Sequence, residues 1–174
     1  MHDTSGAPSV VAMTEPSEFS IVDANFEDVY RREYPGLVAV ATALSGDDGE
    51  DLVQDTMIGA LIQWDQVGRL ERPGGWCHRV LINLCRNRWR RRRTEARHLP
   101  RLRREEPTTP APSDDVMAFW SAVRTLPQRP GLVVALFYAG DRTVAEVASI
   151  LDVPEGTVRS DLTGARAALI SRLE

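Results

Sequence analysis

Five polar side chains between residues 79 and 93 recur at helical spacing and could bind the phosphates of a nucleic acid. Arg79, Asn83, Arg86, Arg90 and Arg93 are separated by four, three, four and three residues, so a helix would align them on one face. Guanidinium groups one turn apart suit successive phosphates, and an asparagine among them can donate to and accept from a base edge. A solvated basic face is the plain alternative, but the absence of acidic partners along these positions favours a nucleic-acid interface.

The charge distribution also indicates a nucleic-acid partner. Residues 86–104 hold ten of the 21 basic residues and a single acidic one, although the whole chain carries a net charge of −4. A concentrated basic stripe releases counterions from a polyanion, and acidic surroundings limit indiscriminate binding. Three scattered histidines and the lack of a Gly-rich phosphate loop argue against catalysis, so we expect no catalytic residue, metal or cofactor.

Composition predicts a globular protein with its own core. The chain has 174 residues, of which 43% are hydrophobic. Its longest apolar stretch, residues 132–139, is far shorter than the roughly 20 residues that cross a bilayer. Residues 1–22 lack a basic segment followed by an apolar run, so we expect a cytoplasmic protein without a membrane partner. Cys77 and Cys85 are expected to be reduced core thiols.

Apolar residues follow a period of 3.6 in two blocks, which predicts an all-α chain of two small helical domains joined by a Pro/Arg-rich linker. Residues 1–22 form an expected disordered tail and residues 23–93 the first domain. The Arg- and Pro-rich residues 94–113 are expected to be a flexible linker, because dense prolines favour extended chain. Residues 114–174 form the second domain.

The helix that begins near Glu50 has two apolar sides. Val53, Met57, Ala60 and Trp64 form one of them, whereas a second lies elsewhere on the helix. This second side consists of Ile58 and Ile62 among Asp51, Gln54 and Asp55. Packing between neighbouring helices and docking of another protein both explain it.

The helix expected after Pro73 carries the basic face opposite an apolar stripe. The stripe consists of Cys77, Val80, Leu81, Leu84 and Cys85. Trp76 and Trp89 flank the basic face. Each could stack on an unpaired base, although core packing is favoured for both.

The second domain ends in a predicted helix-turn-helix. Thr143 and Glu146 form a capping box before an apolar pattern that ends at Leu151. A turn over residues 152–154 then leads into a helix with an inner face from Val158 to Leu169. The second helix of such a motif normally enters the major groove of DNA. An ordinary helical hairpin is the alternative.

Two separate stretches resemble the extracytoplasmic-function (ECF) group of bacterial sigma factors. The sequence DLVQDT at residues 51–56 resembles the polymerase-binding motif of that group, and residues 76–93 resemble the helix that handles the minus-10 promoter element. The sequence VPEGTVRS at residues 153–160, followed by Ala165 and Arg166, is similar to the recognition helix for the minus-35 element. The resemblance covers residues 23–174.

The resemblance implies a non-enzymatic subunit that joins core RNA polymerase, through its beta-prime clamp and beta subunits, and opens promoter DNA. It would bind duplex and single-stranded DNA at the nucleoid, and an anti-sigma protein is a further implied partner. Three sets of residues follow from the resemblance. Polymerase binding is assigned to Asp51, Leu52, Gln54, Asp55, Ile58 and Ile62. Minus-10 binding is assigned to Trp76, Arg79, Asn83, Arg86, Asn87, Arg90 and Arg93, together with the loop at residues 67–73. Minus-35 binding is assigned to Thr143, Glu155, Thr157, Arg159, Ser160, Thr163 and Arg166.

The recognition helix departs from the pattern of the group. Asp161 and Gly164 stand where basic residues are usual, which predicts a weakened grip on the minus-35 element. Asp152 replaces a turn glycine, and aspartate tolerates the left-handed conformation. Two other classes remain open. A stand-alone helix-turn-helix regulator would bind duplex sites tightly by itself, and an Arg-rich RNA-binding protein would keep its affinity without residues 114–174.

Overall fold

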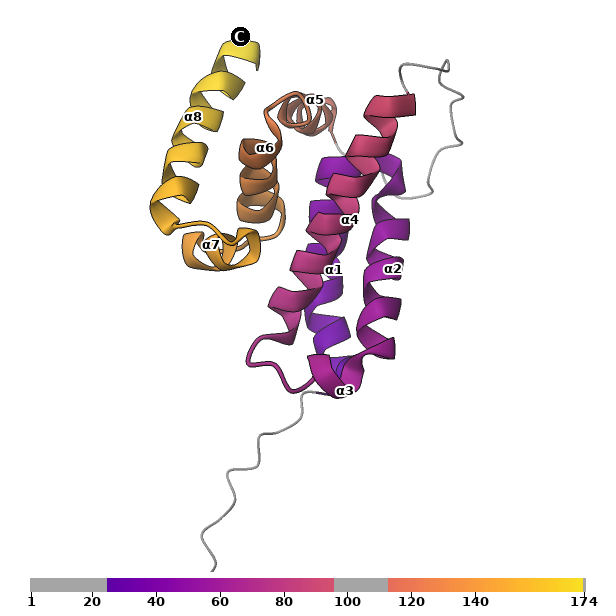
Figure 1. Cartoon of the computed structure of the whole chain (residues 1–174). Helices are drawn as coiled ribbons and strands as arrows, with labels where there is room; N and C mark the ends of the chain where they lie inside the picture. The colour runs from indigo at the N-terminus through magenta and orange to yellow at the C-terminus, as the bar shows by residue number, and fades with distance from the viewer. Residues whose placement is uncertain (1–24, 96–112, 174) are drawn as a thin grey trace, which may run out of the picture.

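The computed structural model describes residues 25–95 and 113–173, which form eight α-helices and no strand (Figure 1). The helices fall into two groups, an N-terminal domain of α1–α4 and a C-terminal domain of α5–α8 with a helix-turn-helix. The predicted all-α fold with two helical domains is therefore confirmed. The expected tail and nearly all of the expected linker lie outside the described residues, and α4 continues as far as Glu95.

The N-terminal domain is built from three helices that lie side by side and one short helix. These are α1 (Phe26–Ser45), α2 (Gly49–Ile62), the short α3 (Trp64–Val67) and α4 (Pro73–Glu95), with a 3-10 turn at Gly46–Asp48. The Asn25 side chain accepts a hydrogen bond from the Glu27 backbone at 3.2 Å and so caps α1. Fully buried residues such as Leu37, Val53 and Leu81 form the core between the helices, and Cys77 and Cys85 are free buried thiols, as expected.

The centre of the C-terminal domain is a buried apolar stretch from Gly131 to Leu136. It consists of α5 (Asp114–Val123), α6 (Gln128–Val134) with a π-helical extension over Ala135–Ala139, α7 (Val144–Leu151) and α8 (Glu155–Leu173). Both hydrogen bonds of the predicted capping box form at the start of α7, between Thr143 and Glu146. Asp152 ends α7 in the left-handed conformation, with φ 55° and ψ 53°. The helix-turn-helix therefore has the local geometry that its sequence predicts.

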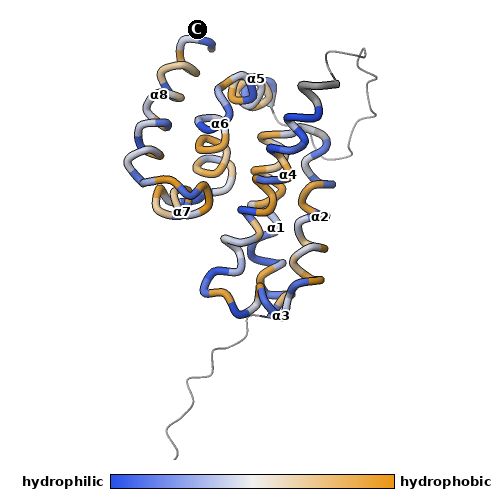
Figure 2. Tube along the Cα trace, in the orientation of Figure 1, coloured by the Kyte–Doolittle hydropathy of each residue, from blue (hydrophilic) through white to orange (hydrophobic). Residues whose placement is uncertain are grey.

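The two domains pack against each other. One continuous hydrophobic cluster runs from Leu37 and Leu81 in the first domain to Leu132 and Val147 in the second. The backbone of Gly140, just after the π-helical segment, approaches α1 so closely that an added Cβ would lie 2.8 Å from Val40 Cγ2. Hydrophilic residues gather toward the carboxyl end of α4, beyond this contact (Figure 2). Among the described residues, no helix is long and apolar enough to span a membrane.

Candidate nucleic-acid and protein interfaces

The polar face predicted on α4 is largely open to solvent. We define the α4 strip as Arg79, Asn83, Arg86, Asn87 and Arg90. All of these except Arg86 are exposed, and Arg86 is half-buried where α4 meets the second domain. Trp76 is also half-buried and packs against the hydrophobic core, whereas the side chain of Arg93 lies outside the described part. The helix therefore presents an ordered row of amide and guanidinium groups.

The buried face of α4 is wider than its sequence pattern predicts. Cys77, Leu81 and Cys85 are buried as expected, but His78 and Ile82 are buried as well. Val80 and Leu84, assigned to the same stripe, are only partly buried. The C-terminal domain packs against α4 through α7, and Arg142 and Glu146 lie near His78.

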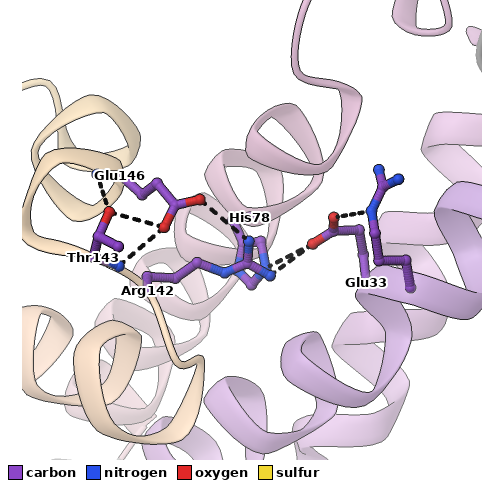
Figure 3. Close-up of polar contacts among 6 residues, drawn as sticks. Glu33, His78, Arg142, Thr143 and Glu146 are labelled. Atoms are coloured by element: carbon purple, nitrogen blue, oxygen red, sulfur yellow. Dashed lines mark hydrogen bonds and ion pairs between the residues drawn. The ribbon is translucent and has the colours of Figure 1, made fainter.

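A group of charged side chains joins the domains next to His78 (Figure 3). Arg142, just before α7, donates from Nη2 to Oε2 of Glu33 on α1 at 2.7 Å. The other carboxylate oxygen of Glu33 accepts from Arg32 Nε at 2.9 Å. Nε2 of His78 lies 3.6 Å from Glu33 Oε2, which is long for a hydrogen bond, and neither ring nitrogen has a hydrogen-bond partner among the described residues. Glu33 is only 5% exposed and His78 is 0% exposed.

This environment lowers the pKa values of both Glu33 and His78. Contact with His78 and the guanidinium groups of Arg32 and Arg142 lower the pKa of Glu33 to about 2, although burial opposes the change. Burial lowers the pKa of His78, and the neighbouring carboxylate of Glu33 offsets only part of that effect. The folded protein therefore holds an ionised Glu33 beside a neutral His78.

These shifts predict that stability falls as the solution is acidified. Below about pH 6.5 the unfolded chain gains a proton on His78 that the folded chain does not bind, so the free energy of unfolding decreases by up to about 1.4 kcal/mol per pH unit. The ion pairs of Glu33 stabilise the fold above its ordinary pKa of 4.5, and this contribution is lost between about 4.5 and 2. Urea denaturation at pH 7.5 and 5.5 measures the first window, and His78→Gln is the control. An equal loss of stability in the variant would contradict the assignment to His78.

We define the α2 face as Asp51, Gln54, Asp55, Ile58 and Ile62, which are all exposed, and its centre is apolar. The side chains of Ile58 and Ile62 are 56% and 78% exposed, and Asp51, Gln54 and Asp55 surround them on the same side. Leu61, which the sequence pattern did not single out, is 56% exposed and joins them. Its position on the helical wheel, three residues after Ile58, could have identified it. Leu52 differs, because it is buried in the hydrophobic core and supports this face from beneath.

The predicted contacts of the helix-turn-helix lie along one side of α8. Glu155, Arg159, Ser160, Thr163 and Arg166 are exposed, and Thr157 is half-buried. Arg159 bonds to Glu155 at 2.7 Å, and Arg166 Nε donates to the Tyr138 hydroxyl at 2.8 Å. Thr143 is the exposed N-cap of α7, where its hydroxyl is used within the capping box. The structure thus places all these residues on the two helices of the motif or their caps.

Asp161 has a partner that the sequence did not indicate. Its two carboxylate oxygens accept hydrogen bonds from Nε and Nη2 of Arg129 on α6, at 2.7 and 3.2 Å. This bidentate pair neutralises the negative charge of Asp161 on α8. The described residues contain no cluster of three or more His, Cys, Asp or Glu that could hold a metal ion.

Each of the two domains matches a known protein family. The model of Sigma-70 region 2 matches residues 29–95, and that of Sigma-70 region 4 matches residues 117–169. The chain is 28% identical to the ECF RNA polymerase sigma factor SigM of Mycobacterium tuberculosis, over 97% of this chain and 84% of that protein. It is 30% identical to the ECF RNA polymerase sigma factor EcfG of Rhodopseudomonas palustris, over 80% of each. Its fold is similar to that of the sigma factor RpoE, solved in complex with the anti-sigma factor NepR from Bartonella quintana. That similarity has a TM-score of 0.69 and 27% identity, over 85% of this chain and 96% of that one.

Proposed function

Because this chain belongs to the ECF sigma factors of the sigma-70 family, which act in promoter recognition and transcription initiation by RNA polymerase, we propose a specific role for each of its exposed faces. The α2 face binds core polymerase, the α4 strip binds the minus-10 element and α8 reads the minus-35 element. The single observation that carries this proposal is the presence of the α2 face and the α4 strip as separate exposed surfaces of one region 2 domain.

The α2 face has the chemistry of a protein-binding surface. Ile58, Leu61 and Ile62 provide apolar contact area, and the polar Asp51, Gln54 and Asp55 can hydrogen-bond around it. Three aliphatic side chains exposed side by side are typical of a surface that a partner covers. We propose that this partner is a helical surface of the polymerase beta-prime clamp.

The α4 strip suits a promoter that is being opened. Arg79 and Arg90 supply charge for phosphates, and Asn83 offers a donor and an acceptor to an exposed base. Capture of an unpaired base stabilises the open state relative to the duplex, so these contacts would drive melting. The loop before Pro73 lies at the start of α4 and would frame the captured strand.

The C-terminal domain would dock α8 in the major groove at the minus-35 element. Arg159 and Arg166 lie at the edges of its exposed side, where phosphates would pass, while Ser160 and Thr163 lie nearer its centre. An anti-sigma protein is a further proposed partner, since the similar RpoE was solved with NepR.

Loss of Arg159 should weaken promoter binding mainly through its charge. We expect Arg159→Ala to lower holoenzyme affinity for a duplex promoter several-fold and to reduce the slope of log affinity against log salt by about 0.9. Fluorescence anisotropy across a salt series measures both quantities. Arg172→Ala, in the last turn of the same helix, is the matched control. An unchanged slope for Arg159→Ala would remove Arg159 from the DNA contact.

Association with core polymerase tests the proposed function at its first step. Full-length protein should co-purify with core polymerase and retard a promoter fragment only in its presence. Tight binding to a duplex operator without polymerase would instead support a stand-alone helix-turn-helix regulator.

A further inference from the structure

We propose that the packing of the C-terminal domain on α1 and α4 is a closed state that cannot engage a whole promoter, and that the Arg142–Glu33 ion pair is the latch that holds it closed. This inference rests on the proposed function for its consequence at a promoter. The latch itself is a property of the free protein.

Polar contacts cross between the domains at separate places along the part of the chain that the structure describes. Arg142 Nη2 donates to Glu33 Oε2 at 2.7 Å, and Arg79 Nη2 donates to the Ser149 carbonyl oxygen on α7 at 3.0 Å. At the other end of the contact, Arg124 Nη1 donates to the Ala43 carbonyl oxygen at 3.1 Å. The domains are therefore fixed along their length and not hinged at one point.

The closed packing is incompatible with the proposed DNA contacts. The minus-10 and minus-35 elements lie about 25 base pairs apart, or roughly 85 Å at ~3.4 Å per base pair. Arg79, in the α4 strip, is instead hydrogen-bonded to the first helix of the helix-turn-helix. The α4 strip and α8 cannot span that length of duplex while α7 lies against α4, so the domains must separate when the holoenzyme binds a promoter.

The Arg142–Glu33 pair is an interdomain contact between two full charges. One of them is an almost fully buried carboxylate, whereas Arg79 donates to a neutral carbonyl group at the edge of α7. The Glu33 carboxylate packs directly against the backbone of Gly74. A Cβ at that position would lie 2.4 Å from Glu33 Cδ, so a larger residue there would displace the carboxylate. Figure 3 shows Arg142 reaching from the C-terminal domain to this carboxylate beside His78. Charge-assisted hydrogen bonds are stronger than those between neutral groups. Their loss destabilises a contact most when one of the two partners is buried.

Arg32 provides a matched control for the latch. It donates to the same carboxylate at 2.9 Å, but it lies next to Glu33 on α1, so this bond joins two residues of one domain. Arg142→Ala should raise the ratio of open to closed molecules about tenfold, whereas Arg32→Ala should leave it unchanged. Glu33→Gln keeps the shape of the side chain and should open the domains to a smaller extent.

Distance measurement by pulsed electron paramagnetic resonance tests the latch in the full-length chain. Spin labels on Asp28→Cys in α1 and Ser171→Cys in α8 report on the two domains, since both positions are exposed and the native Cys77 and Cys85 are buried. We expect one narrow distance distribution in the free protein and an added longer population in Arg142→Ala. A broad distribution in the free protein, or identical distributions in Arg142→Ala and Arg32→Ala, would overturn the latch.

Addition of core polymerase separates the latch from the proposed function. The distance should lengthen when core polymerase and a promoter fragment are added, and Arg142→Ala should assemble faster. A distance that stays short within the assembled complex would overturn the closed-state proposal. If core polymerase does not bind at all, the proposed function fails, while the comparison between the free variants still decides whether the latch exists.

Discussion

Replacement of Ile58 or Ile62 by aspartate is expected to lower the affinity for core RNA polymerase by about 100-fold. Both side chains are more than half exposed, so the free protein should tolerate the change. At the centre of a protein interface, loss of an apolar anchor costs ~2 kcal/mol or more, and burial of an unpaired carboxylate adds to that cost. Titration of labelled protein with core polymerase measures the effect.

The control for this prediction is an equally drastic change elsewhere on the surface. Leu173→Asp alters an aliphatic side chain that is 51% exposed at the end of α8, far from α2. It should bind core polymerase within a few-fold of the native protein. Equal losses in Leu173→Asp and Ile62→Asp would mean that α2 holds no specific docking site, and unchanged binding by Ile62→Asp would reject the assignment outright.

Asn83→Ala is expected to reduce transcription from a duplex promoter by roughly tenfold while leaving closed-complex formation nearly unchanged. Asn83 is the uncharged member of the α4 strip that is suited to read an unpaired base, and a good base contact is worth ~1 to 3 kcal/mol. A template that is already melted around the minus-10 element removes the opening step, so it should restore most of the lost activity. Abortive initiation on the two templates measures the difference.

Arg91→Ala provides the comparison on the same helix. Arg91 is exposed and lies two helical turns beyond Asn83, at the edge of the α4 strip, so its loss should remove charge without removing the base contact of Asn83. Its effect should be small and equal on both templates. If Asn83→Ala were equally impaired on duplex and melted templates, capture of a single-stranded base by this residue would be rejected.

The parts of the structure that depend on neighbouring residues could be predicted from the sequence. The capping box of Thr143 and Glu146 and the left-handed Asp152 are local, because each is decided by side chains within a few positions. The basic face of α4 likewise follows from helical periodicity alone. Such features need no knowledge of the tertiary fold.

What could not be predicted depends on contacts between distant segments. His78 and Ile82 are buried on α4, and α7 packs against this helix, a contact that no nearby sequence pattern predicts. Glu33 and Arg142 are 109 positions apart, and in the sequence neither residue differs from an ordinary surface charge. The same is true of Asp161, whose partner Arg129 lies on another helix. The weakened minus-35 binding predicted from Asp161 assumes an unpaired carboxylate, whereas Arg129 pairs with it.

Run-off transcription tests most directly whether this chain directs core RNA polymerase to promoters. Purified full-length protein and core polymerase are incubated with fragmented genomic DNA of the source organism, and the transcripts are sequenced. We expect discrete transcripts with common start sites that require the chain and are lost with Ile62→Asp. Transcription that is no more specific than that of core polymerase alone, over all fragments, would contradict the claim.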